Sequence, residues 1–150
     1  MKLCLLVFLR AALAFSAPAD VEIFSAQDLQ KMAESMEVKG SSYADRNLAR
    51  YKDHYLLLVK REESGSSEVH EHEADIFVVE NGQGTLLSGG TLVKPHTIKT
   101  GEIRGAGIAG GVQRSVSAGD IIHIPAGTPH QLLLEKGKPF TYFVVKVAGQ

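Results

Sequence analysis

The stretches Glu68–Gly84 (EVHEHEADIFVVENGQG) and Gly119–His130 (GDIIHIPAGTPH) decide the fold of this chain. Each contains a short apolar run bounded by Gly, Pro or Asn-Gly, which is typical of a β-strand between two turns. In the first stretch, His70 and His72 stand two residues apart, and on an extended strand this spacing points both imidazoles to the same face. We therefore expect two strand-and-turn units that carry histidines into a common site.

These histidines and a nearby acid form a candidate metal site. Asp75 follows His70 and His72 closely, and His130 comes directly after a Pro/Gly corner. Three imidazoles and one carboxylate suit one divalent transition metal ion, with positions left open for water or substrate. Iron, manganese, zinc, nickel and copper all accept such donors, so the identity of the metal stays open. Two alternatives remain: Asp75 caps a strand and leaves a three-histidine centre, or the histidines lie in exposed loops.

The second stretch resembles the second motif of the cupin superfamily, Gly-x5-Pro-x-Gly-x2-His-x3-Asn. Gly119, Pro125, Gly127 and His130 stand at the spacings of that motif, and Leu134 occupies the position where Asn is usual. Leu134 would share a strand face with His130, because side chains alternate along a strand. The interior is then drier at that level, which favours an organic ligand with an apolar body.

The first stretch resembles the first cupin motif, Gly-x5-His-x-His-x3,4-Glu-x6-Gly, with two departures. His70 and His72 match the histidine pair, while Gly65 lies one residue too close to it. Asp75 replaces the glutamate one residue early and keeps the six-residue interval to Gly82. The resemblance therefore carries the same four ligands, with a shorter acid than usual.

The resemblance implies an all-β fold, a double-stranded β-helix or jelly-roll cupin barrel, to which this sequence adds a short N-terminal helix. Cupins include dioxygenases, isomerases, decarboxylases and lyases, so the resemblance implies a metal-binding protein that is a small-molecule enzyme, without naming a substrate. The alternative is a non-catalytic cupin that binds or senses a small ligand. A storage protein with a relic site is a third class, and the retained ligand set argues against it. Cupins commonly pair through strand edges, so a homodimer is a further expectation.

Length and charge limit the number of domains and the classes of partner. With 150 residues, the chain is long enough for one domain with its own core. Its formal net charge of −1 gives no electrostatic reason to expect nucleic acid or anionic lipid as a partner.

Residues 1–19 resemble a secretory leader. A lysine and an apolar run precede a small-residue cleavage site at residues 17–19. Cleavage would leave residues 20–150 as a single exported domain, periplasmic or secreted, with no membrane anchor and without Cys4, the one cysteine of the chain. Arg10 interrupts the apolar run, so an N-terminal helix of the mature domain is the alternative.

The remaining elements follow from periodicity and turn residues. Ser25 and Asp28 form a capping-box pattern that predicts a helix to about Met36. Residues 39–47 are polar and turn-like, and Asn81-Gly82 predicts a hairpin. Strands are expected at residues 51–61, 76–80, 85–87, 112–117, 121–124, 131–135 and 140–147.

The segment Thr91–Ile108 is expected to form an inserted hairpin or flap over the pocket, because the two motifs are far apart in the sequence. It carries Glu102 and Arg104, which would reach the mouth of the pocket as an acid and an anion clamp, or form a solvated ion pair. Glu102 and His123 are the candidates for catalytic proton transfer. The alternative for His123 is an ordinary histidine on a strand.

Overall fold

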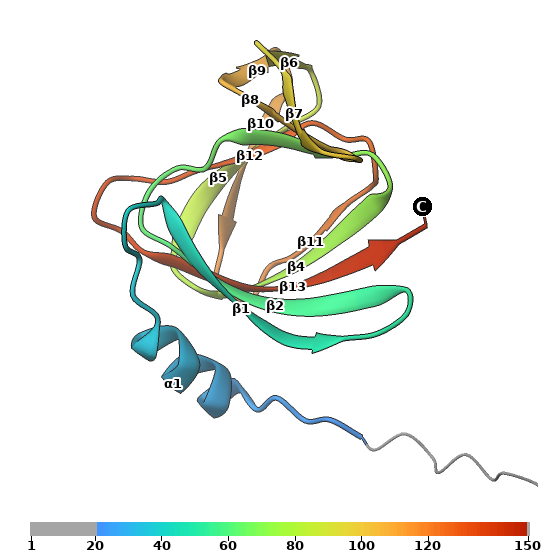
Figure 1. Cartoon of the computed structure of the whole chain (residues 1–150). Helices are drawn as coiled ribbons and strands as arrows, with labels where there is room; N and C mark the ends of the chain where they lie inside the picture. The colour runs from blue at the N-terminus through green and yellow to red at the C-terminus, as the bar shows by residue number, and fades with distance from the viewer. Residues whose placement is uncertain (1–20, 150) are drawn as a thin grey trace, which may run out of the picture.

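The computed structural model describes residues 21–149, in which a helix precedes two facing antiparallel β-sheets (Figure 1). The predicted leader, residues 1–19, lies outside this range. Along the chain the elements are α1 Ala26–Ser35, β1 Tyr43–Arg50, β2 His54–Arg61, β3 Ser67–His70, β4 Glu73–Asn81, β5 Gln83–Ser88, β6 Thr91–Val93, β7 His96–Lys99, β8 Glu102–Gly105, β9 Gly107–Ala109, β10 Val112–Ser117, β11 Ile121–Ile124, β12 His130–Leu133 and β13 Phe140–Ala148. Among the residues so described, no helix has the length and apolar character needed to cross a bilayer.

The chain alternates between the two sheets as it builds them. The first sheet has the strand order β1-β2-β13-β4-β11, the second has the order β10-β5-β12-β3-β8-β7, and β6 pairs with β9 in a ribbon of its own. Thus β3 lies in the second sheet, β4 in the first and β5 in the second, and β11, β12 and β13 alternate in the same way. This winding is that of a jelly roll, and the predicted all-β class with a short N-terminal helix is confirmed.

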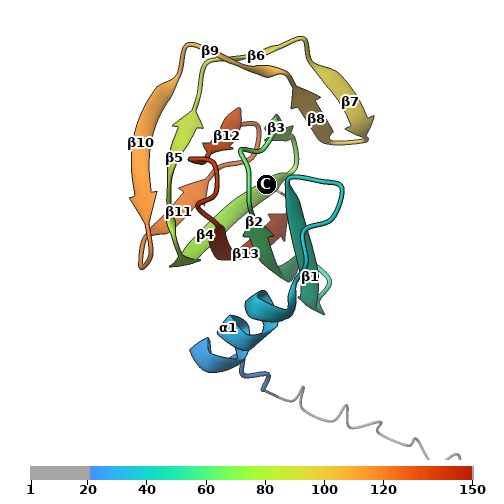
Figure 2. The ribbon, with the colours of Figure 1, turned by 90° about the vertical axis from the view of Figure 1, so that its left-hand side faces the viewer.

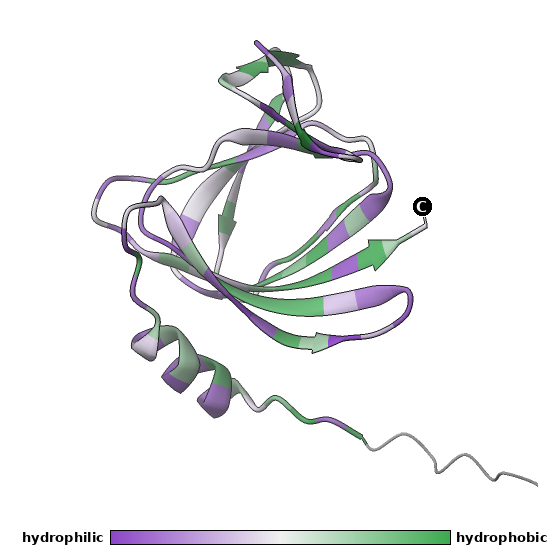
Figure 3. Ribbon diagram, viewed as in Figure 1, coloured by the Kyte–Doolittle hydropathy of each residue, from purple (hydrophilic) through white to green (hydrophobic). Residues whose placement is uncertain are grey.

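Helix α1 begins where the capping pattern predicts. Ser25 is its N-cap, and the Ser25 hydroxyl oxygen accepts a hydrogen bond from the backbone N–H of Asp28 at 3.1 Å. Leu29 and Met36 pack against Leu58 of β2, outside the barrel. Figure 3 shows hydrophobic and hydrophilic residues alternating around α1, as expected for a helix with one packed face. The helix therefore covers the first sheet from outside and leaves the barrel interior to the strands.

The turn-like prediction for residues 39–47 is confirmed for residues 39–42, which form bends and irregular structure, and is wrong from Tyr43 on, where strand β1 begins. β1 pairs with β2, with an irregularity between Asn47 and Ala49. Its residue Ala44 packs against the core beneath α1. The polar composition of the segment hides this strand, since an edge strand is held by its pairing more than by its own propensity.

The predicted hairpin at Asn81-Gly82 is also wrong. β4 pairs with β13 and β11, whereas β5 pairs with β10 and β12, so the chain crosses from one sheet to the other at Gly82. Gly82 has a φ of +91°, and a Cβ atom there would lie 2.4 Å from the backbone oxygen of Pro139. The crossing therefore needs glycine both for its backbone conformation and for the close approach of Pro139.

The expected insertion at residues 91–108 is present and lies beside the candidate site. β6 pairs with β9, and β7 pairs with β8, which in turn pairs with β3 (Figure 2). This β3–β8 pairing aligns Glu68 with Arg104 and His70 with Glu102. The insertion thus extends the second sheet at the strand that carries the first histidine.

A hydrophobic core between the sheets adjoins a polar cavity. The core contains Val79, Leu86, Leu132 and Phe140, and the apolar stretches of β2, β4 and β13 are visible in Figure 3. Other core members, Val59, Phe77, Tyr142 and Val144, also line the cavity. The site is therefore held by strands whose positions the core fixes.

Replacing Gly82 with Ala is expected to destabilise the protein more than replacing Gly119 with Ala. Both glycines have nearly the same φ, +91° and +92°, so both variants carry the same backbone strain. A Cβ at Gly119 meets nothing within 4 Å, whereas at Gly82 it meets the Pro139 oxygen. We expect the Gly82→Ala variant to lose about 1–3 kcal/mol more free energy of unfolding, measured by urea denaturation. Equal losses in the two variants would contradict the close crossing.

Candidate metal centre

The cavity lies between the two sheets and has a volume of about 220 Å³. Its walls come from β1, β2, β4 and β13 of the first sheet and from β3 and β8 of the second. Charged side chains are frequent in these walls: Asp45, Arg61, Glu68, Glu73, Asp75, Glu102, Arg104 and Lys146. A cavity of this composition is suited to a polar ligand or an ion.

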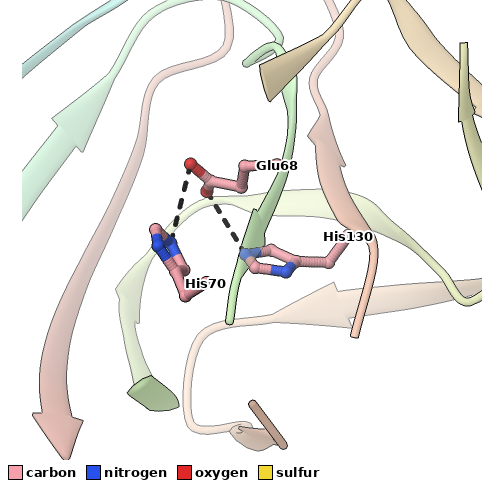
Figure 4. Close-up of side chains that lie close together, drawn as sticks. All are labelled: Glu68, His70 and His130. Atoms are coloured by element: carbon pink, nitrogen blue, oxygen red, sulfur yellow. Dashed lines mark ion pairs between the residues drawn. The ribbon is translucent and has the colours of Figure 1, made fainter. Parts of the chain in front are cut away.

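Three ligand-type side chains lie close together (Figure 4), and two of them, Glu68 and His70, line the cavity. Ligand atoms of Glu68, His70 and His130 all lie within 4.8 Å of one another. Glu68 Oε1 is 3.3 Å from His130 Nε2, and Glu68 Oε2 is 3.8 Å from His70 Nε2. Glu68 and His70 point inward from β3 because they are two residues apart on it, and the pairing of β3 with β12 places His130 opposite Glu68.

Asp75 of β4 stands beside both imidazoles. Its Oδ2 atom is 3.6 Å from His70 Nε2 and 3.6 Å from His130 Nε2. The Nζ atom of Lys146 on β13 lies 2.8 Å from each oxygen of this carboxylate. The side chain of Asp75 is 2 % exposed and that of Lys146 is 11 % exposed, so the pair is buried in the wall. Asp75 therefore faces the cluster with its charge already compensated by Lys146.

These distances match the spacing of the donors around a tetrahedral metal ion. Donors held about 2.1 Å from such an ion lie about 3.4 Å from one another. The carboxylate-to-imidazole separations from Glu68 and Asp75, 3.3 to 3.8 Å, are close to that value, and the ligand atoms of Glu68, His70 and His130 all lie within 4.8 Å of one another. The residues present therefore fit a divalent transition metal ion.

The tautomer of His130 also fits a metal ligand. Its Nδ1 atom is 3.0 Å from the backbone oxygen of Thr128, and a carbonyl oxygen only accepts, so Nδ1–H donates. In the neutral ring this leaves a lone pair on Nε2, directed toward the cluster. The Nε2 atoms of His70 and His130 are buried, and among residues 21–149 neither makes a hydrogen bond. A lone pair that faces the Glu68 carboxylate is repelled unless a proton or a metal ion lies between them.

The electrostatics of the cluster favour a neutral His70 and an ionised Glu68. Burial lowers the pKa of His70, and the charge of Lys146 lowers it further, although Asp75 and Glu68 oppose them. Burial alone would raise the pKa of Glu68, but its contact with His130 and nearby positive charge, including that of Arg104, outweigh burial and lower it. Neutral imidazole and carboxylate are the protonation states that metal binding requires.

The structure does not place His72 in the cluster, and the prediction that His70 and His72 share a strand face is wrong. β3 ends at His70, and His72 lies in the bend that precedes β4, where it is exposed. The backbone N–H of Glu71 donates to the Gly101 oxygen, so the chain turns toward the insertion at this point. This bend breaks the alternation on which the prediction depended.

Glu68 is the site residue that the sequence reasoning missed. The inward pair on β3 is Glu68 and His70, and four residues then separate His70 from Asp75. That interval meets the three or four residues of the cupin motif, whereas the interval from His72 is one residue short. The interval between the histidine and Asp75 was thus the available signal. It indicates that the histidine pair of the motif corresponds to Glu68 and His70, and not to His70 and His72.

The two candidates for proton transfer have different surroundings. Glu102 lines the cavity, where it accepts a hydrogen bond of 2.9 Å from Arg104 Nε and lies 3.2 Å from Lys99 Nζ. Burial would raise the pKa of Glu102, but the contacts with Arg104 and Lys99 outweigh it and lower the pKa. His123 is exposed on β11 and is not among the described residues that line the cavity. Leu134 packs against the core and likewise does not line the cavity within residues 21–149.

Replacing Lys146 with Met is expected to destabilise the metal-free protein by about 3–5 kcal/mol, because Asp75 would keep a buried charge with no partner. The double variant Asp75→Asn/Lys146→Met should regain most of this loss. The matched control is Lys138→Met, whose partner Glu135 is 69 % exposed, and it should cost less than about 1 kcal/mol. Urea denaturation of the three variants measures these differences, and similar losses for the two single variants would contradict a buried pair.

Comparisons with known proteins identify the fold. No protein-family model matches the chain, and no curated protein sequence matches it significantly. Among solved structures, it is similar to a conserved Klebsiella pneumoniae protein with a double-stranded β-helix domain, with a TM-score of 0.60 and 18 % identity over 87 % of this chain and 93 % of that one. It is also similar to the cupin domain of Schizosaccharomyces pombe Cnp3, with a TM-score of 0.56 and 8 % identity over 77 % of this chain and 70 % of that one. The polyketide cyclase RemF of Streptomyces resistomycificus matches with a TM-score of 0.51 and 20 % identity over 71 % of this chain and 65 % of RemF. The chain therefore has the double-stranded β-helix fold of the cupins, as its two motifs predict.

Proposed function

We propose that this protein binds one divalent transition metal ion through Glu68, His70 and His130 and acts as an enzyme on a small molecule in the adjoining cavity. The observation that carries this proposal is the pair of buried Nε2 atoms, which converge on one carboxylate without a hydrogen-bond partner among the described residues. The hydrogen bond between His130 Nδ1 and Thr128 supports it, since it fixes the tautomer that leaves Nε2 free.

A metal ion held by these residues would supply Lewis-acid or redox chemistry to a ligand in the cavity. The chain's own residues would hold a proton near the ligand and exclude water from it. Lys146 holds a proton at Nζ, lines the cavity and is fixed by Asp75. The core residues Phe77 and Val144 form apolar parts of the wall and exclude water from one side of the ligand. Asp75 would become a fourth metal ligand only by giving up part of its contact with Lys146.

Similarity to a polyketide cyclase supports an enzyme that acts on an organic molecule, at the level of the fold. The reaction classes that remain candidates are those of a dioxygenase, an isomerase or a lyase. In each case the proposed metal ion would lie beside the cavity in which the small molecule binds, and Glu68 and His70 belong to both the cluster and the cavity wall.

A non-catalytic binding protein is the second candidate, and one observation favours it. The predicted proton-transfer residues are poorly suited to that role: Glu102 lines the cavity but forms an ion pair with Arg104, and His123 is exposed on β11 and does not line it. Lys146, which also lines the cavity, is a further candidate for proton transfer. The metal site alone suits either function.

Metal binding is tested with the wild-type protein and three histidine variants. We expect about one metal ion per chain in the wild type, measured by elemental analysis and by titration of the metal-free protein. His70→Ala and His130→Ala should each lower the affinity by at least about a hundredfold, since each removes a donor atom. His72→Ala is the matched control, because its imidazole is exposed and only two residues away, and it should keep wild-type affinity.

Two results would contradict this proposal. One is a loss of affinity in His72→Ala as large as that in His130→Ala, which would place the metal elsewhere. The other is a wild-type protein that takes up no iron, manganese, zinc, nickel or copper after reconstitution.

An enzyme and a binding protein differ in whether the ligand is recovered unchanged. We expect metal-loaded wild-type protein, incubated with a small-molecule extract, to consume at least one compound that His130→Ala leaves intact, as followed by mass spectrometry. Compounds that the wild type retains but does not alter would instead favour the non-catalytic function.

A further inference from the structure

Arg61 is a buried cation in the cavity wall that forms no direct ion pair within the described part of the chain. It is the last residue of β2 and is 6 % exposed, and it lines the cavity. The other two cations of the wall are compensated, since Arg104 contacts Glu68 and Glu102 and Lys146 contacts Asp75. Among residues 21–149, no carboxylate lies within 4.0 Å of the Arg61 guanidinium. A buried charge of this kind is costly unless a bound group neutralises it.

The hydrogen bonds of Arg61 use one of its five N–H groups. Arg61 Nε donates to the Tyr142 hydroxyl at 3.1 Å. Within the described part of the chain, Nη1 and Nη2 make no hydrogen bond, so four donors remain available. Burial raises the pKa of Tyr142 to about 12, although Arg61 opposes this shift. Tyr142 is therefore neutral at neutral pH and forms no ion pair with Arg61. Burial would lower the pKa of Arg61, but Tyr142 and the charge of Glu68, which lies beyond 4.0 Å, raise it.

The surroundings hold the guanidinium in a fixed orientation. Its Cζ atom lies over the Tyr43 ring at 4.8 Å from the ring centre, in a cation–π contact. On another side, a Cβ atom at Gly65 would lie 2.7 Å from Arg61 Nη1, so the backbone of Gly65 packs directly against the group. With Nε bound to Tyr142 and the backbone of Gly65 against one side, the donors left for a ligand are the N–H groups of Nη1 and Nη2 that point away from Gly65.

Aromatic and aliphatic side chains line the space next to these N–H groups. The Tyr142 and Phe77 rings contact each other with 4.6 Å between ring centres and a tilt of 38°, and both residues line the cavity. Leu57 and Val59 precede Arg61 on the same inward row of β2 and line it as well. The cavity thus offers a cation at one place and flat or apolar surfaces beside it.

We infer that Arg61 binds the carboxylate of a small organic acid whose planar, apolar body lies against Tyr142 and Phe77. A planar carboxylate pairs with two parallel N–H groups of a guanidinium, as the free end of Arg61 presents them. A phosphate dianion would bring a second negative charge into a wall that already holds Glu68, Asp75 and Glu102, with one guanidinium to meet it. The cavity of about 220 Å³ is below the size of pockets for drug-sized ligands, roughly 300–1,000 Å³, which indicates a small acid.

This inference deepens the proposed function, because the acid would lie in the same cavity as the proposed metal ion. The part that concerns Arg61 is nevertheless independent of the metal, since it depends on the guanidinium and its neighbours alone. Metal-free protein can therefore be used to test it.

The experiment compares benzoate with benzamide, its uncharged counterpart, by calorimetric titration of metal-free protein after the chelator has been dialysed away. We expect benzoate to bind at least tenfold more tightly than benzamide. Arg61→Met should abolish this preference, and Arg61→Lys, which keeps the charge but loses the planar pair of donors, should keep part of it. Arg46→Met is the matched control, because Arg46 is exposed on β1 and does not line the cavity, and it should retain the preference.

Several outcomes would overturn the inference. These are equal binding of benzoate and benzamide by the wild type, no binding of either at millimolar concentration, or the same loss in Arg46→Met as in Arg61→Met. Tighter binding of inorganic phosphate than of benzoate, lost in Arg61→Lys, would overturn the assignment to a carboxylate. If Arg61→Met does not fold, the comparison of the two probes in wild type and Arg61→Lys decides the question. A protein that binds metal but shows no preference for benzoate would contradict this inference and leave the metal proposal standing.

Discussion

The barrel buries two imidazoles and two carboxylates against one another. The structure depends on how the lone pairs and negative charges of these groups are compensated. His70 and His130 direct Nε2 atoms at Glu68 and Asp75 from 3.3 to 3.8 Å away. Such an arrangement is repulsive if the rings are neutral and nothing lies between, and attractive if a proton or a metal ion does. The hydrogen bond of His130 to Thr128 excludes the tautomer that would place the proton on Nε2 of a neutral ring. A divalent ion, as proposed, would satisfy both rings and the carboxylate at once.

The rest of the fold serves to bring these groups together from distant parts of the chain. Glu68 and His70 come from β3, Asp75 from β4, His130 from β12 and Lys146 from β13. The pairing of β3 with β12 joins the first group to His130, and the pairing of β4 with β13 brings Lys146 opposite Asp75. The core residues along β4 and β13 fix these strands, so the charged groups need no mobile loop to meet. The three cations of the cavity wall differ in their partners. Lys146 and Arg104 compensate acids of the protein, and Arg61 is left for a ligand.

Much of the fold follows from the sequence because local signals and pairing agree there. The bounds of β10 and β11 match the alternating apolar runs between Gly and Pro, and Ser25 caps α1 as its pattern predicts. The local sequence signals fail where long-range contacts determine the structure. β1 has a polar sequence and is stabilised by pairing with β2, and Asn81-Gly82 has the composition of a hairpin turn but carries the chain between sheets.

The site could be predicted only in part, because local signals agree with the fold at some of its residues and not at others. His130 follows a Pro/Gly corner and Asp75 lies on a strand, and the structure buries both side chains, whereas their predicted role as metal ligands stays a prediction. The spacing of His70 and His72 suggested a shared face, but a bend after His70 turns His72 outward, and Glu68 takes the inward position instead. The proposed role of Arg61 could not be predicted from the sequence. It depends on which carboxylates lie near the guanidinium in the folded protein.

A crystal structure of the metal-loaded protein, with anomalous diffraction recorded at the absorption edge of the metal, tests the central claim most directly. The account predicts one anomalous peak between Glu68, His70 and His130, about 2.0–2.2 Å from each donor atom. A peak at His72, or an empty cluster in which a doubly protonated His130 donates from Nε2 to Glu68, would contradict it.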